Sequence, residues 1–418
     1  MINQILGWLT LTIIFFTIIK YTKNDLSLKR VLIFSFFLRF LLLLINQYVF
    51  PLPGSTFDAK TFEIQAWQYS QTYGFSVFYN LFQNDAYLIS RIISIFYTLT
   101  SRSEMMAQGI SLGLGTASIY LVYLLSLMIW SKETSIKISW FASIYPPMVL
   151  YSVLVLREAY VNFFLLLTLI ACVSFIKNLF KDKKYLIEIN QNIKLLIFIV
   201  GGFFILKHFH GGIFTGFFVF LIFIGYCFFQ REFKNLKKGI IKFKIIVIFT
   251  FAITPFILWY LGILNIPYVP GIEEAQRLDE VLLRRFRLGS VSAVHGVFGA
   301  AYPEWTIPTN NFDFIPKLFV RIIYFLYSPF PWDIKRYVHS IGYIDAIFLF
   351  YFTICAFQNR RAIWQNRELR FLLFVLIAFI VTYGLGTNNF GTAIRHKSKF
   401  IFILICIAGP KLKKLAFH

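Results

Sequence analysis

The sequence predicts an all-α, polytopic membrane protein, and composition, hydropathy and run lengths all point to it. The 418-residue chain has 58% apolar and 14% charged residues and a mean hydropathy of +0.69, whereas soluble domains carry roughly 25% charged residues. Apolar runs of bilayer-crossing length recur along the chain. This composition excludes disordered, collagen-like, coiled-coil and disulfide-stapled secreted chains. All four cysteines lie inside apolar runs and predict neither disulfides nor a zinc site: Cys172, Cys227, Cys355 and Cys406.

We expect about eleven transmembrane helices in a single integral membrane domain that covers residues 1–418, with the first segment kept as an anchor. The stretch 138–176 must turn, because one helix of that length would reach nearly twice the ~30 Å thickness of the hydrocarbon core. Its only charged break is Arg157–Glu158. The expected spans are 4–20, 31–50, 108–130, 138–156, 159–176, 193–206, 212–229, 243–263, 340–357, 370–385 and 398–410.

The net charge of +22 follows from the expected topology and requires no nucleic-acid partner. With the N-terminus outside and the C-terminus in the cytoplasm, the cytoplasmic segments hold 24 Lys and Arg against 6 Asp and Glu, a surplus of +18. The outer segments hold 16 basic and 12 acidic residues, a surplus of +4. Cytoplasmic loops collect Lys and Arg, so this asymmetry predicts the orientation.

Two outer segments, 51–107 and 264–339, are too long to be simple connections between spans. In the first, Phe62, Ala66 and Tyr69 follow helical spacing, as expected for a helix that lies in the membrane interface. Long loops on one face usually carry binding or catalytic groups. We therefore expect the chemistry on the outer face.

The first candidate residues for catalysis follow the second expected span. Asp58 lies at a membrane–loop junction, where a carboxylate is well placed to take a proton from a hydroxyl. Glu63 is the second candidate base. The alternative for Asp58 is structural, since Ser55-x-x-Asp58 fits a capping box that opens a helix.

Arg157 and Glu158 follow Tyr145-Pro146-Pro147, which should kink the preceding span. A charge pair at the end of a span is costly unless it is partnered or wet. Arg157 can bind phosphate through its planar fork of donors. An ordinary ion pair that ends two helices explains the residues equally well.

Further cationic groups lie at the outer face. Arg395, His396 and Lys397, with Lys399, form a cationic patch that opposes the positive-inside trend, which favours phosphate binding over stabilisation at lipid headgroups. Arg284 and Arg285 give their segment a local excess of positive charge, which could bind an anion. The same pattern also fits the solvent-exposed face of a charged helix.

Two other motifs have mainly structural readings. Lys207-His-Phe-His-Gly-Gly212 fits an interfacial turn better than a metal site, because no third ligand is near in sequence. The two prolines in Tyr324–Asp333 forbid a straight span and favour a re-entrant or interfacial element. The sequence has no Asp-x-Asp motif and no phosphate-binding loop of the Gly-x-x-x-x-Gly-Lys type. We therefore expect metal-independent transfer from a phosphate-linked donor, without a cofactor.

Together these motifs resemble the GT-C superfamily of membrane glycosyltransferases, and within it the bacterial polysaccharide repeat-unit polymerases (Wzy-type O-antigen or capsule polymerases). The resemblance rests on Phe57-Asp58-Ala59, the Tyr145–Glu158 stretch, Ser328-Pro-Phe-Pro-Trp332 and Arg395-His-Lys397, and on the overall layout. It implies that Asp58 acts as base and that arginines, Arg157 and Arg395 among them, engage the carrier phosphates.

The resemblance also implies a substrate, partners and a location. The substrate is an undecaprenyl-diphosphate-linked glycan, polymerised on the outer face of the bacterial inner membrane during lipopolysaccharide or capsule synthesis. Membrane lipids, a flippase and a chain-length regulator are the implied partners. Two alternatives remain open: a GT-C transferase that uses polyprenyl-phosphate sugars, and, in another class, a flippase or exporter of lipid-linked glycans. A flippase usually shows repeated halves, and no repeat is visible.

Overall fold

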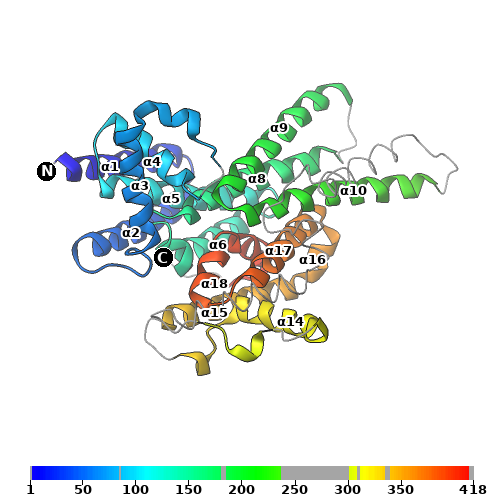
Figure 1. The fold of residues 1–418 in the computed structure, drawn as a ribbon. Coiled ribbons are helices and arrows are strands. Elements are labelled where there is room, and N and C mark those ends of the chain that lie inside the picture. Colours follow the sequence, from blue (N-terminus) through cyan, green and yellow to red (C-terminus); the bar gives the residue numbers. More distant parts are fainter. Residues whose placement is uncertain are drawn as a thin grey trace.

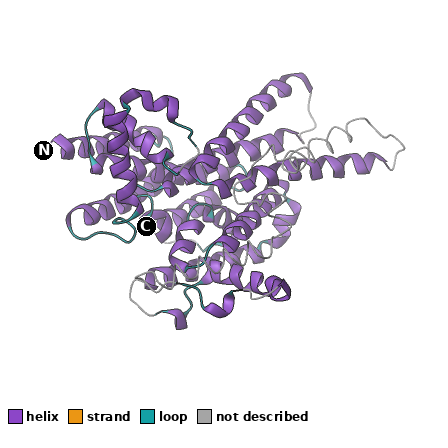
Figure 2. Ribbon diagram, viewed as in Figure 1, coloured by secondary structure: helices purple, strands orange, loops and turns teal. Residues whose placement is uncertain are grey.

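The expected all-helical fold is confirmed for the part of the chain that the structure describes. The computed structural model describes residues 2–83, 86–179, 185–236, 301–307, 311–334 and 339–413. Within these ranges all regular elements are helices (Figure 2), and the one β-bridge joins Ala301 to Asn389.

Helices α1 to α10 lie within residues 2–236 (Figure 1). Their bounds are α1 Ile2–Tyr21, α2 Leu26–Tyr48, α3 Asp58–Thr72, α4 Leu88–Leu99, α5 Glu104–Leu127, α6 Lys132–Ile144, α7 Pro146–Leu150, α8 Arg157–Leu179, α9 Tyr185–Phe209 and α10 Thr215–Leu236, with 3₁₀ turns η1 Gly74–Asn80 and η2 Gly211–Phe214. The later elements are η3 Glu304–Thr306, α14 Asn311–Tyr327, η4 Pro331–Asp333, α15 His339–Gln358, α16 Arg360–Gln365, α17 Arg367–Gly386, α18 Phe390–Lys397, α19 Ile401–Ala408 and η5 Gly409–Lys411.

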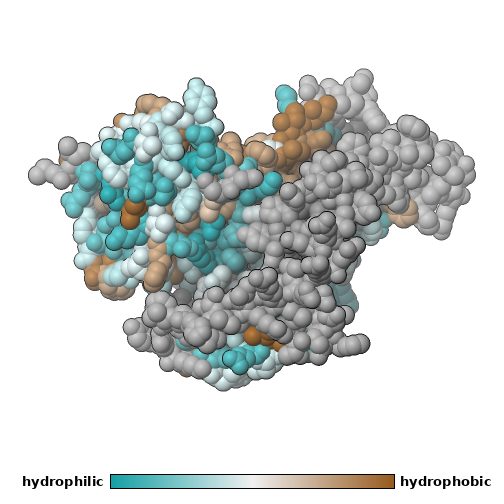
Figure 3. Space-filling model, in the orientation of Figure 1, coloured by the Kyte–Doolittle hydropathy of each residue, from teal (hydrophilic) through white to brown (hydrophobic). Residues whose placement is uncertain are grey.

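Six of the described helices are long and apolar enough to cross a membrane, which makes the chain a helical membrane protein. They are Asn3–Tyr21, Glu104–Leu127, Arg157–Leu179, Gln191–Phe209, Gly211–Gln230 and Arg367–Gly386. Each coincides with an expected span. Exposed apolar side chains cover the projecting α9, where Figure 3 shows a hydrophobic surface, as expected for a helix whose solvent is lipid.

The other expected spans are shorter, interrupted or outside the described residues, so the number eleven stays a prediction. The region 31–50 lies in α2, and 340–357 coincides with the shorter apolar helix Gly342–Gln358. The region 398–410 is not one continuous α-helix, because α19 has only eight residues, or about 12 Å of helix. Region 243–263 lies outside the described residues.

Different polar contacts join the helices at the two ends of the bundle. At one end, Lys132 pairs with Asp25 at 2.8 Å, and Trp130 Nε1 donates to Cys406 O at 2.9 Å. At the other end, Arg395 joins α3 to α8. The orientation of these two ends in the membrane stays a prediction.

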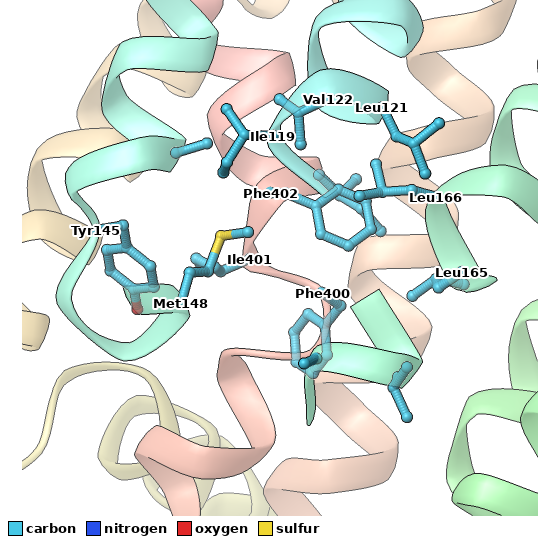
Figure 4. Close-up of a cluster of buried hydrophobic side chains, with 14 of the residues drawn as sticks. Ile119, Leu121, Val122, Tyr145, Met148, Leu165, Leu166, Phe400, Ile401 and Phe402 are labelled. Atoms are coloured by element: carbon cyan, nitrogen blue, oxygen red, sulfur yellow. The ribbon is translucent and has the colours of Figure 1, made fainter. Parts of the chain in front are cut away.

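The core lies between α5, α8, the α6–α7 segment and α19. Figure 4 shows Ile119, Leu166, Tyr145, Phe400 and Phe402 as members of one cluster of hydrophobic side chains, and all of them are buried. Gly115 of α5 permits a close approach, because a Cβ there would lie 2.3 Å from the Cβ of Ser152. Packing of small residues at such contacts is the usual way that membrane helices come together.

The proline pair breaks the span at 138–156, as the sequence predicts. α6 ends at Ile144, and α7 begins at Pro146. Pro147 has no N–H to donate to Ser143 O, and that carbonyl accepts instead from Arg39 Nη1 at 3.4 Å. Arg39 is fully buried in α2 and also donates to Ser152 Oγ at 2.8 Å. The freed backbone carbonyl thus has a partner inside the protein, as the membrane interior requires.

The first long loop is largely helical, and its apolar stripe packs inward. Phe62 and Ala66 of α3 are buried, and Phe62 O accepts from Ser90 Oγ of α4 at 2.8 Å. The expected helix is confirmed. Its apolar residues were expected at the membrane interface, but Phe62 and Ala66 face α4 instead. The expected capping box is wrong: α3 begins at Asp58, and Phe57 at the N-cap makes no side-chain cap bond.

The described part of the second loop also ends in a break at prolines, as the sequence predicts. α14 ends at Tyr327, and Ser328 precedes Pro329 and the short turn η4. Arg321 of α14 is buried and donates from Nη2 to Thr387 O at 2.8 Å, which ties α14 to the end of α17.

Candidate functional site

A single guanidinium joins three elements that are far apart in sequence. Arg395, in the last turn of α18, pairs through Nη1 with Asp58 Oδ2, and its Nε donates to Glu158 Oε1 at 2.8 Å. Asp58 is the first residue of α3, and Glu158 lies in the first turn of α8. Three residues singled out separately in the sequence therefore lie together. We call Asp58, Arg157, Glu158, Arg395 and Lys399 the charge cluster.

The carboxylates of the charge cluster differ in exposure. The side chain of Asp58 is 54% exposed, whereas that of Glu158 is 1% exposed. Lys399 is also buried and lies with Nζ 3.4 Å from the same Oε1 of Glu158. A buried carboxylate is costly unless it is paired, and Glu158 meets that requirement with two cations. Burial opposes the charge on Arg395, but Glu158 and Asp58 together raise the pKa of its guanidinium above the ordinary value.

Arg157 completes the charge cluster from the other side of α8. Its Nη1 donates to Phe209 O at 3.3 Å, and its guanidinium lies 5.4 Å from the centroid of the Phe62 ring. The cluster therefore contains three cations and two carboxylates. Arg157 Nε and Arg395 Nη2 are buried and have no hydrogen-bond acceptor among the described residues. Unsatisfied buried donors of this kind are costly in a protein interior.

Two histidines lie beside the charge cluster. His210 lies between α9 and η2, and its Nδ1 is hydrogen-bonded to Tyr383 OH at 2.9 Å. His396 Nδ1 lies 3.0 Å from Thr387 Oγ1, and the two imidazole rings are 5.3 Å apart. Burial, then the charge of Lys399, holds the pKa of each histidine well below the ordinary value.

Lys397, expected at the phosphate site, points elsewhere. It is fully buried, its Nζ lies 2.6 Å from Asp345 Oδ2, and it donates to Leu326 O at 2.9 Å. Tyr145 donates a hydrogen bond to the same carboxylate. The geometry assigns Lys397 to the packing of α18 on α15, so the expected cationic patch divides between two separate acids.

Glu63 is fully engaged away from the charge cluster. It accepts from Arg102 Nε at 3.0 Å and Nη2 at 2.7 Å, and from Tyr97 OH at 2.9 Å. Its side chain is 4% exposed. The structure therefore places Glu63 in a contact that holds α3 and α4 to the start of α5, and does not bring it together with Asp58.

The remaining sequence candidates have mixed outcomes. Arg284 and Arg285 lie outside the described residues. Within the described ranges, no group of three or more His, Cys, Asp and Glu side chains is placed to hold a metal ion, and the expectation of metal-independent chemistry stays a prediction. Tyr383 was missed because nothing in the sequence singles out a tyrosine within an apolar span. His210 was expected in an interfacial turn, with a metal site as the weaker alternative.

The chain matches no protein-family model, no curated protein and no solved structure.

Proposed function

We propose that the protein is a membrane glycosyltransferase that uses a polyprenyl-diphosphate-linked glycan as donor, with the charge cluster as its active site. The observation that supports this most directly is the position of Arg395 between Asp58, a partly exposed base candidate, and Glu158, a buried anchor. A guanidinium so placed can exchange one carboxylate for a phosphate while the other keeps it in position.

The unsatisfied donors favour an anionic ligand with several oxygens. Arg157 Nε and Arg395 Nη2 are both buried without a described acceptor. Phosphate oxygens accept from guanidinium groups in a two-point geometry that a lysine cannot provide. The surplus of one cation over the carboxylates of the cluster adds a field that attracts a diphosphate.

In the proposed reaction, the donor diphosphate replaces Asp58 on Arg395, which frees the Asp58 carboxylate. Asp58 then takes the proton of an acceptor sugar hydroxyl. The hydroxyl oxygen forms a bond to the anomeric carbon, and the bond from that carbon to the phosphate oxygen breaks. The lipid diphosphate leaves with the electron pair, and Arg157 and Arg395 stabilise its charge.

The charge distribution supports a location of this site on the outer face of a bacterial inner membrane. The end of the bundle opposite the charge cluster is rich in basic residues, and such ends face the cytoplasm. They include Lys20, Lys23, Lys132, Arg360, Arg361 and Arg367. The proposed partners are membrane lipids, a flippase that delivers the donor and a chain-length regulator.

The two long outer loops favour polymerisation of glycan repeat units over transfer of a single sugar, because both donor and acceptor then carry glycans. A transferase that uses a polyprenyl-monophosphate sugar would need only one such binding region. A purified protein supplied with each donor class in turn distinguishes these two reactions by the product formed.

The decisive variant is Asp58→Asn, which keeps the size of the side chain but removes most of its basicity. We expect normal membrane levels and loss of glycan elongation from undecaprenyl-diphosphate-linked repeat units. The matched control is Glu104→Gln, which removes an exposed acid from the first residue of α5 and should leave elongation unchanged. Normal chain length from Asp58→Asn would refute its role as base. Movement of intact donor across vesicles without elongation would instead indicate a flippase.

A further inference from the structure

The proposed reaction leaves the two half-buried histidines, His210 and His396, without a role. His210 comes from the segment between α9 and η2, and His396 from α18, so the fold brings together two residues that are far apart in the sequence. Their rings lie 5.1 and 4.9 Å from the Tyr383 ring of α17. Lys399 Nζ lies 5.6 Å from the same Tyr383 centroid. Two histidines, a tyrosine and a lysine thus share one buried region.

The hydrogen bonds of Thr387 identify which nitrogen of His396 carries a proton. Thr387 Oγ1 donates to Tyr383 O at 2.6 Å, which uses its only hydrogen. The contact of 3.0 Å between Thr387 Oγ1 and His396 Nδ1 therefore requires the imidazole to donate. In the neutral ring this leaves Nε2 unprotonated and able to accept a proton.

Cations from α8 and from α18 with the turn that follows it disfavour a charge on the histidines. Lys399 follows α18, Arg395 lies within it, and Arg157 begins α8, and these three cations lower the pKa of both rings in addition to burial. Both histidines lie outside the candidate membrane spans. A charge on either imidazole would add to an existing positive surplus, which Asp58 and Glu158 do not cancel.

We propose that His396, with His210 beside it, is a further part of the anion site and takes up a proton at Nε2 when a diphosphate binds. The proposal rests on the proposed anion-binding function of the charge cluster. A ligand with two or more negative charges reverses the sign of the local field, so the imidazolium that was disfavoured becomes favourable. Binding of the anion and binding of the proton then strengthen each other by the same factor.

The proton comes from solvent, and no covalent bond of the ligand changes. In consequence the site holds the anion more tightly as pH falls, by up to about tenfold per pH unit where one proton is taken up. The same coupling helps the site to keep a leaving diphosphate during transfer.

Titration calorimetry of the full chain in lipid nanodiscs tests this with inorganic pyrophosphate as the probe. Measurements near pH 7 in two buffers of different ionisation heat give the number of protons taken up per pyrophosphate bound. The critical variant is His396→Asn, whose amide can still donate to Thr387 Oγ1 but lacks a titratable Nε2. We expect the wild type to take up more protons than His396→Asn, and the titration of pyrophosphate itself cancels in the difference.

The control is His339→Asn, which removes a buried histidine of α15 that contacts the Phe390 ring edge to face. It should match the wild type. Equal proton uptake by the wild type and a folded His396→Asn would overturn the histidine proposal and leave the anion site standing. Absence of pyrophosphate binding by the wild type would instead refute the anion site. If His396→Asn does not fold, His396→Gln serves in its place. The pH dependence of the wild-type affinity is a second test. If that affinity changes with pH only as the titration of pyrophosphate itself requires, the proposal is overturned.

Discussion

Lys397 and Asp345 form an ion pair at 2.6 Å in which both side chains are fully buried. The pair joins α18 to α15, and Tyr145 extends it to the break between α6 and α7. It is therefore a further polar contact that holds α18, beside the contact of Arg395 with Glu158.

Removal of one member of this pair should be strongly destabilising. Lys397→Met leaves the Asp345 carboxylate buried without its cation, for which we expect a loss of about 3–5 kcal/mol. The double variant Lys397→Met, Asp345→Asn should recover much of that loss, because no charge remains buried. Thermal unfolding in detergent measures both. A Lys397→Met protein that is as stable as the wild type but binds pyrophosphate weakly would return Lys397 to the phosphate site.

Arg395→Lys should weaken anion binding while the protein stays folded. Lysine keeps the charge but cannot contact Asp58 and Glu158 through two separate nitrogens of one planar group. We expect the affinity for pyrophosphate to fall by about tenfold, or about 1.4 kcal/mol. The matched control is Arg102→Lys, which disrupts an equally bidentate contact with Glu63. It should lower stability with affinity unchanged, and an equal loss of affinity in the two variants would contradict the assignment.

Glu63→Gln should distinguish the structural role of Glu63 from the proposed catalytic role of Asp58. Glu63 accepts from Arg102 and Tyr97 in a buried position, so we expect a stability loss of about 1–3 kcal/mol. Turnover per folded molecule should remain that of the wild type. Complete loss of elongation in a stable Glu63→Gln protein would make Glu63 the better candidate for the base.

The contact of Asp25 with Lys132 should make a small, pH-dependent contribution at the basic end of the bundle. Burial opposes the charge on Asp25, but the hydrogen bond and charge of Lys132 outweigh it and lower the Asp25 pKa below 3.8. The stabilisation is therefore complete above the unfolded value and is lost as pH falls through the folded one. Thermal melts between pH 3 and 7 should show wild type and Asp25→Asn, which keeps an N-cap acceptor, converging at the acid end. A gap that widens in acid would contradict this sign.

Labelling with a membrane-impermeant maleimide tests the orientation. All four native cysteines are buried, so background labelling should be low. Tyr79, 92% exposed on η1, lies in the first outer loop, whereas Lys23 lies between α1 and α2. Tyr79→Cys should react in intact cells, and Lys23→Cys only after the membrane is opened. The reverse pattern would invert the topology, and with it the proposed location of the active site.

Hydropathy predicted the helical spans best where a long apolar segment forms one unbroken helix, as in α8 and α17. It predicted helix length less well where the apolar helix is short, as at Ile401–Lys411. The region 398–410 is as apolar as a span, yet Phe400 and its neighbours bend the chain between α18 and α19. Such a break depends on contacts with Glu158 and Asp345, more than 50 residues away, which periodicity cannot reveal.

The sequence identified the members of the charge cluster as candidate functional residues, but it did not predict that they lie together. Asp58, Glu158 and Arg395 are separated by 100 residues or more, and nothing local predicts that they touch. One error was avoidable. Successive helical residues turn by about 100°, so Arg395 and Lys399 share a face that Lys397, two residues on, does not. Helical geometry alone therefore favoured Lys399 over Lys397 as the partner of Arg395.

The buried Arg39 has a consequence for the order in which the chain enters the membrane. Arginine at the centre of an isolated inserting helix costs about 2.5–3.5 kcal/mol, and within α2 only Ser35 offers Arg39 a hydrogen-bond partner outside the regular helix ladder. Its other acceptors belong to Ser143, Met148 and Ser152, and the last is 113 residues further along. At usual synthesis rates those residues leave the ribosome on the order of ten seconds later. We therefore expect α2 to remain in the insertion machinery or at the bilayer surface during that interval, until α6, α7 and Ser152 supply the missing acceptors.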